Sequence, residues 1–151
     1  MGLGAIFLIA LGSGCSEPAS GSGFVPGLGE IMGAQQMRHS KLWFAGQAQN
    51  WPLAGYELDE LQEGFADAVT FHPTHKDCPE PLTTLVPQFT DEPVAELRAA
   101  IAARDETRFM AAHDGLTAAC NGCHEAAGFG YNRVTRPTTN PYSNQDFNAP
   151  H

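Results

Sequence analysis

Apolar residues recur every three or four positions along four stretches of this chain, and that period is typical of α-helices rather than β-strands. The first stretch, residues 28 to 49, carries one shared face: Leu28, Met32, Gln35, His39, Leu42 and Gly46, with Ile31 and Trp43 beside it. The second stretch begins with Pro52 in a first-turn position, where its missing N–H costs nothing. Its apolar stripe comprises Leu58, Leu61, Phe65 and Ala68. The few residues between these helices predict antiparallel packing.

The second half of the chain predicts two more helices after a proline-rich connection. Residues 71 to 89 contain Pro73, Pro79, Pro81 and Pro87, which indicates a long crossover with room for one helical turn. Thr90 is the expected cap of a third helix, whose Val94, Leu97 and Ile101 face inward. Asp105 is the expected cap of a fourth, whose buried stripe comprises Phe109, Ala112, Leu116, Ala119, Cys120 and Cys123. The sequence therefore predicts an all-α fold, an antiparallel four-helix bundle with a long crossover between helices two and three and an irregular C-terminal tail.

The N-terminus differs in composition from the bundle. An apolar run of about nine residues is followed by small residues and Cys15, which resembles a bacterial lipoprotein signal with a lipidated cysteine. Residues 16 to 27 are rich in Gly and Ser and form an expected flexible tether. The predicted organisation is an export signal over 1–15, a tether over 16–27, a helical bundle over 28–130 and an irregular tail over 131–151 that packs on the bundle.

The sequence "CNGCH" places Cys120, Cys123 and His124 close together near the end of the fourth helix. A redox dithiol of the thioredoxin type needs a βαβ context, which the sequence lacks. Structural zinc needs four ligands, and its second pair would have to combine Cys78 with His72 or His75. Covalent haem uses all three residues without help, because two thiols add to the vinyl groups and the histidine binds iron. The motif therefore predicts one covalent haem c.

A four-helix bundle whose single CxxCH motif lies at the end of the fourth helix resembles the cytochrome c prime family. The resemblance covers about residues 28 to 124 and rests on the topology and on "CNGCH". It implies a distal residue from the start of the first helix, often Met, Leu or Phe, and a five-coordinate iron that binds nitric oxide or carbon monoxide. The chain differs from the family in having Gly128 where a basic residue is usual and in continuing for 27 residues after the motif.

Met32 is the expected residue opposite His124, because antiparallel packing brings the end of helix four beside the start of helix one. Its thioether would either bind iron or crowd the distal face. His39 is the second choice of ligand, although it lies about 10 Å further along the helix axis at 1.5 Å per residue. Arg133 and Arg136 are expected to meet the haem propionates.

The other histidines and Cys78 are not expected to bind the haem. His72 and His75 are expected to be solvated loop residues. His113 shares a helix with His124, which makes it a poor opposite ligand. No role follows from the sequence for Cys78.

The net charge of −9 argues against nucleic acid as a partner and favours docking to a basic patch on a redox partner protein. No apolar run reaches the roughly 20 residues of a membrane-spanning helix. The sequence also shows no arrangement typical of an enzyme. We therefore expect a periplasmic electron carrier, anchored by lipid at Cys15, and the possibility of a homodimer stays open. The alternatives are a five-coordinate protein that binds a small gas and, more distantly, a structural zinc module.

Overall fold

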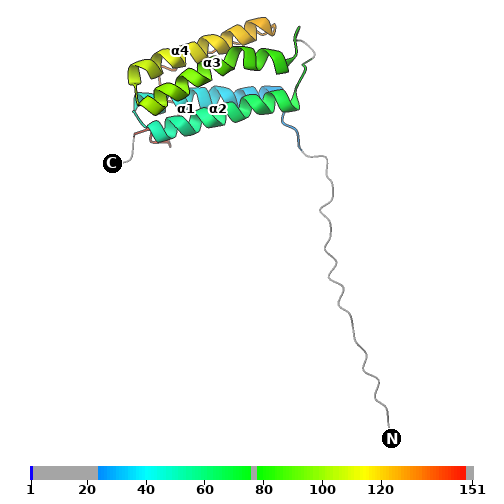
Figure 1. Ribbon diagram of the computed structural model, residues 1–151, viewed down its shortest axis with the longest axis horizontal. Coiled ribbons are helices and arrows are strands. Elements are labelled where there is room, and N and C mark those ends of the chain that lie inside the picture. The colour runs from blue at the N-terminus through cyan, green and yellow to red at the C-terminus, as the bar shows by residue number, and fades with distance from the viewer. Residues whose placement is uncertain (2–23, 76–77, 149–151) are drawn as a thin grey trace.

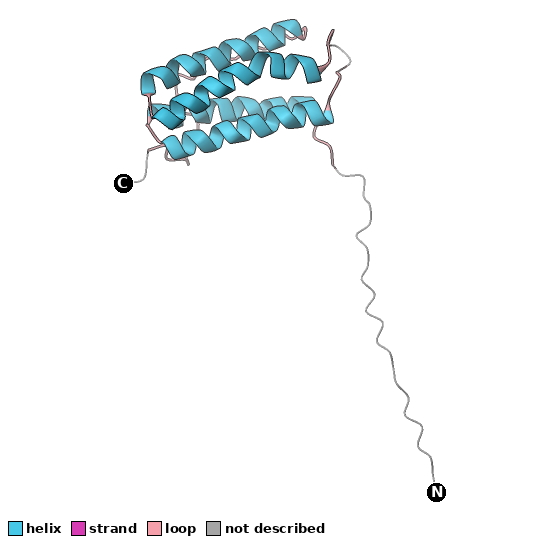
Figure 2. Ribbon diagram, in the orientation of Figure 1, coloured by secondary structure: helices cyan, strands magenta, loops and turns pink. Residues whose placement is uncertain are grey.

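The computed structural model describes residues 1, 24–75 and 78–148, so the predicted signal after Met1, with Cys15, and most of the tether lie outside the described residues. It contains four helices: α1 (Leu28–Gln47), α2 (Trp51–Phe71), α3 (Leu82–Ala103) and α4 (Glu106–Ala126). Within the described ranges no residue forms a strand (Figure 2). None of the described helices is both long and apolar enough to cross a membrane.

Two helical hairpins pack on each other, α1 with α2 and α3 with α4 (Figure 1). Further contacts between α2 and α3 and between α1 and α4 close the arrangement. The predicted four-helix bundle is therefore confirmed. The start of α1, the end of α2, the start of α3 and the end of α4 all lie at one end of the bundle (Figure 1).

Two of the predicted helix starts are explained by side-chain caps. The Asn50 side chain accepts a hydrogen bond from the Leu53 N–H at the start of α2, where Pro52 stands in the first turn as expected. The Asp105 side chain accepts from the Arg108 N–H, which confirms Asp105 as the cap of α4. These caps satisfy backbone donors that would otherwise lack an intrahelical partner.

The predicted start of α3 was wrong. The helix begins at Leu82 and continues through Pro87 and Pro93, so the crossover spans only residues 72–81 and Thr90 is buried inside the helix. The Thr90 hydroxyl donates to the Val86 carbonyl at 2.9 Å instead of capping a helix. A proline inside a helix costs about 3 kcal/mol. Burial of Leu82, Leu85 and Val86 offsets this cost, since each such side chain contributes about 1.5–3 kcal/mol when fully buried.

The hydrophobic core occupies the middle of the bundle and its end opposite the crossover. Its largest fully buried side chains are Phe109, Leu42, Leu58, Leu61, Leu97, Leu116 and His113. Gly46 allows α1 to approach α4 closely, because a Cβ there would lie 2.0 Å from the Phe109 ring. This contact fixes α1 against the helix that carries the CNGCH motif.

The residues after α4 run back along the bundle without regular structure. Phe147 is buried in the core, and the Asn50 amide donates to the Phe147 and Asn148 carbonyls at 3.2 and 3.1 Å. Lys41 lies over the Tyr142 ring, with its ammonium 5.4 Å from the ring centroid. The tail therefore passes from the motif to the opposite end of the molecule.

Candidate functional site

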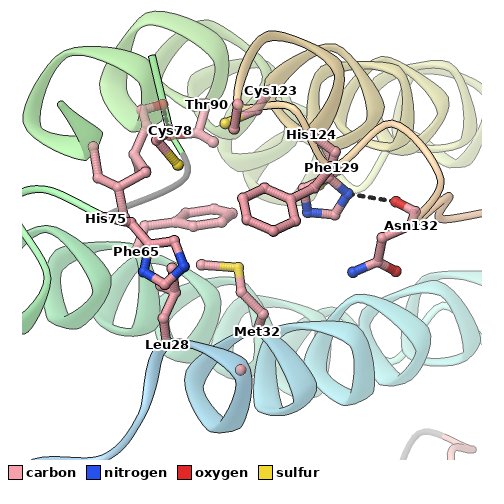
Figure 3. Close-up of a pocket in the computed structure, with 15 residues that line it drawn as sticks. Leu28, Met32, Phe65, His75, Cys78, Thr90, Cys123, His124, Phe129 and Asn132 are labelled. Atoms are coloured by element: carbon pink, nitrogen blue, oxygen red, sulfur yellow. Dashed lines mark hydrogen bonds between the residues drawn. The ribbon is translucent and has the colours of Figure 1, made fainter. Parts of the chain in front are cut away.

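A largely apolar cavity of about 310 Å³ lies at the end of the bundle where the crossover joins α2 to α3. This volume falls at the lower end of the range for small-molecule and cofactor sites. All four helices, the crossover and the start of the tail contribute to its walls (Figure 3). The lining residues include Leu28, Met32, Phe65, His75, Cys78, Leu82, Val86, Thr90, Cys120, Cys123, His124, Phe129 and Asn132.

The two cysteines of the motif line this cavity from α4, one helical turn apart. Burial, with a smaller contribution from Cys123, raises the pKa of Cys120 to about 12. Burial and then the nearby Cys78 raise the pKa of Cys123. Both thiols are therefore protonated at neutral pH, which does not suit a reactive dithiol.

Gly122, between the two cysteines, allows α3 to pack closely against the motif. A Cβ at this position would lie 2.8 Å from the Phe89 ring. The aromatic ring thus occupies the space that any larger residue would need, and this contact holds the motif turn of α4 against α3.

His124 presents one particular ring nitrogen to the cavity. Its Nδ1 lies 2.6 Å from the Asn132 carbonyl oxygen, shown as the dashed line in Figure 3. A carbonyl oxygen can only accept, so in the neutral imidazole Nδ1 carries the proton and Nε2 carries the lone pair. Metal-binding histidines are usually oriented by this kind of second hydrogen bond. The geometry therefore fits Nε2 as a ligand to iron.

Gly128 ends α4 and turns the chain back over the cavity. Its φ of 84° is a left-handed conformation that favours glycine. The Phe129 N–H donates to the His124 carbonyl at 2.7 Å and the Gly128 N–H to the Glu125 carbonyl at 3.1 Å, the bonding of a Schellman motif. A non-glycine residue in this conformation would be strained. This gives a physical reason for a glycine at position 128, where the cytochrome c prime family usually has a basic residue.

Met32 lines the same cavity as the motif, as expected from antiparallel packing. It is half-buried, and its side chain extends from α1 into the cavity (Figure 3). The structure therefore brings together Cys120, Cys123, His124 and Met32.

His39 does not line the cavity but belongs to a buried polar cluster in the core. Its Nε2 lies 2.8 Å from the Thr117 hydroxyl, whose proton is donated to the His113 carbonyl. The His113 Nε2 donates to the His39 carbonyl at 3.1 Å, and the two imidazole rings lie 4.3 Å apart. Both Nε2 atoms are thus donors engaged in the core, which makes His39 poorly suited to bind iron.

The two arginines predicted to meet haem propionates do not line the cavity. Arg136 forms an ion pair with Asp114, and its guanidinium lies 4.5 Å from the Trp43 ring centroid. Arg133 is exposed. Arg136 therefore fastens the tail to the bundle.

Two residues that the haem interpretation does not use, His75 and Cys78, also line the cavity. His75 is half-buried rather than simply solvated, and its ring packs on Phe129 with centroids 5.8 Å apart. Cys78, which also belongs to the crossover, lines the same cavity. The zinc alternative named these two residues, but no cluster of three or more acidic, Cys or His ligands suited to a metal is found among the described residues. His72 lies apart, with its Nε2 2.8 Å from the Pro26 carbonyl.

Searches against protein-family models, curated proteins and solved structures gave no match to this chain.

Proposed function

We propose that this protein is a monohaem c-type cytochrome that transfers electrons in the bacterial periplasm. The observation that carries the proposal is the His124 imidazole, whose Nδ1–H is held by the Asn132 carbonyl while Cys120 and Cys123 line the same cavity. Such a donor set fits a covalent haem, in which each thiol adds its S–H across one vinyl group to form a thioether. When bound, the haem supplies a one-electron iron couple.

The residues of the cavity have distinct proposed roles. Cys120 and Cys123 would hold the cofactor covalently, and His124 would bind its iron through Nε2. Met32 would offer a thioether sulfur as a second protein ligand, as in cytochromes with His and Met ligands. The apolar side chains around them, including Leu28, Phe65 and Phe129, exclude water and so influence the reduction potential.

The alternative is a five-coordinate haem protein that binds a small gas such as nitric oxide or carbon monoxide. The apolar lining of the cavity favours this alternative. If a side chain crowds the iron without binding it, the iron keeps an apolar site where a diatomic gas can bind. In that case Met32 restricts access to the distal side and does not act as a ligand.

The proposed partner is a redox protein with a basic docking patch, since the chain carries 17 acidic and 8 basic residues. We also propose export to the periplasm and a lipid anchor at Cys15, on the basis of the N-terminal signal pattern alone. A diacylated cysteine at the mature N-terminus is the result expected from mass spectrometry, and an unprocessed Met1 would contradict the anchor.

Optical spectra of the purified protein in both oxidation states test the proposed function. An electron carrier should show low-spin c-type haem in both states and should be reduced and reoxidised reversibly. Carbon monoxide should leave its reduced spectrum unchanged at low concentration. A high-spin spectrum that shifts at once with carbon monoxide would favour the gas-binding alternative, and a protein without haem would exclude both.

A further inference from the structure

Asn121, between the two cysteines of the motif, uses both ends of its side-chain amide to bind one residue of the tail. Its Nδ2 donates to the Val134 carbonyl at 2.9 Å, and its Oδ1 accepts from the Val134 N–H at 2.8 Å. The amide thus pairs with the tail as a neighbouring strand would. Asn is among the weaker helix formers, so helix formation does not explain this residue inside α4.

Val134 lies two residues after Asn132, whose carbonyl oxygen orients His124. Asn132 is fixed on its N-terminal side by its own N–H, which donates to the Phe129 carbonyl at 2.8 Å. Val134 is fixed on the C-terminal side by the Asn121 amide. The Asn132 carbonyl lies between these two attachments and accepts from the His124 Nδ1 at 2.6 Å.

The other attachments of the tail act further away. Arg136 pairs with Asp114, and Phe147 is buried near Asn50. These contacts keep the tail on the bundle, but they lie four and fifteen residues beyond Asn132. Within the part of the chain that the structure describes, the hydrogen bonds of the Asn121 amide to Val134 join the motif to the tail two residues after Asn132.

We propose that Asn121 is a positioning residue for the axial histidine: it holds the tail so that the Asn132 carbonyl faces the His124 Nδ1–H. This keeps the imidazole in the tautomer that directs Nε2 into the cavity and raises the basicity of the ring. A more basic imidazole stabilises the oxidised iron more than the reduced iron. The proposal rests on the proposed haem ligation by His124 and adds a role for the residue between the cysteines.

The test compares Asn121→Ala with Asn140→Ala in the full-length holoprotein. Asn140 lies in the same tail and also uses its side chain for a backbone hydrogen bond, to the Tyr142 N–H, but remote from the motif. In Asn121→Ala the haem should stay covalently attached, while the reduction potential should rise and the amide of Val134 should exchange faster with solvent. Asn140→Ala should leave the potential at the wild-type value.

A second variant approaches the same contact from the tail. Val134→Pro removes the N–H that donates to Asn121 and leaves the motif intact, so it should raise the potential in the same direction. It also serves if Asn121→Ala fails to accumulate as folded protein. An unchanged potential in folded Asn121→Ala whose Val134 amide exchanges fast, or in folded Val134→Pro, would overturn the proposal, because the clamp would then be structural only.

Failure of the haem proposal is distinguishable from failure of this one. If the wild-type protein carries no haem, the tautomer of His124 can still be measured by nitrogen-15 NMR. The clamp then predicts an Nδ1-protonated ring in the wild type and loss of that preference in Asn121→Ala. The same tautomer in both proteins would contradict the role of Asn121.

Discussion

Met32, His75 and Cys78 line the cavity outside the motif, and each carries a side-chain atom that could bind iron. If the Met32 sulfur binds, Met32→Ala should convert low-spin oxidised iron to high-spin iron and abolish the thioether-to-iron charge-transfer band. The reduced variant should then bind carbon monoxide. His75→Ala is the matched comparison and should leave the spin state unchanged. Loss of the low-spin state in His75→Ala but not in Met32→Ala would assign the ligand to the crossover instead.

At the residue scale, the sequence predicts cavity-lining residues where their type and spacing are informative. Cys120, Cys123 and His124 follow from one contiguous motif, and Met32 follows from antiparallel packing. His75 and Cys78 were not placed in the site because nothing local indicates which way a proline-rich connection folds. Arg136 does not line the cavity: its partners are Asp114, one to two helical turns before the motif in α4, and the Trp43 ring of α1.

At the scale of elements, Gly128 determines how α4 ends and where the tail begins. Gly128→Ala should destabilise the protein by about 1 kcal/mol, because an alanine is strained at a φ of 84°. Gly115→Ala is the matched control, since Gly115 lies inside α4 with nothing within 4 Å of the added Cβ. It should stabilise the protein by up to about 1 kcal/mol. Urea denaturation of both variants measures the two changes, and equal effects would contradict the assigned role of Gly128.

The four helices themselves were predictable because their apolar residues repeat with the helical period. The start of α3 was predicted too late because prolines usually interrupt helices, and the helical period of the apolar residues before Thr90 was not followed. Leu82, Val86, Thr90, Val94 and Leu97 continue one stripe at steps of four and three, and all five are buried. The stripe thus contained the signal for the true helix start, and tertiary burial outweighed the local cost of Pro87.

At the scale of the whole molecule, the buried pair His39 and His113 makes stability depend on pH. Burial, assisted by the neighbouring His113, lowers the pKa of His39 to about 3. Burial lowers the pKa of His113 to about 4. The hydrogen bond to the His39 carbonyl and the charge of Asp114 oppose this shift, and the charge of Arg136 adds to it. Between these values and about 6.5, the unfolded chain binds protons that the folded protein does not.

Stability should therefore be highest above pH 6.5 and fall as the pH decreases toward about 3, by about 1.4 kcal/mol for each unit of lowered pKa. His113→Phe removes one of these histidines together with its unpartnered Nδ1. The free energy of unfolding of His113→Phe minus that of the wild type should be larger at pH 4.5 than at pH 7. Urea unfolding at both pH values measures this double difference, in which the contributions of shared carboxylates cancel. A constant difference would show that His113 titrates normally.

The most direct test of the whole account is the intact mass of the denatured chain after expression with the machinery that matures c-type cytochromes. The wild type should retain the mass of one haem, and the Cys120→Ala, Cys123→Ala double variant should lose it. Cys78→Ala should keep it, although Cys78 lines the same cavity. Absence of the added mass in the wild type, or its loss in Cys78→Ala with retention in the double variant, would contradict haem attachment through the CNGCH motif.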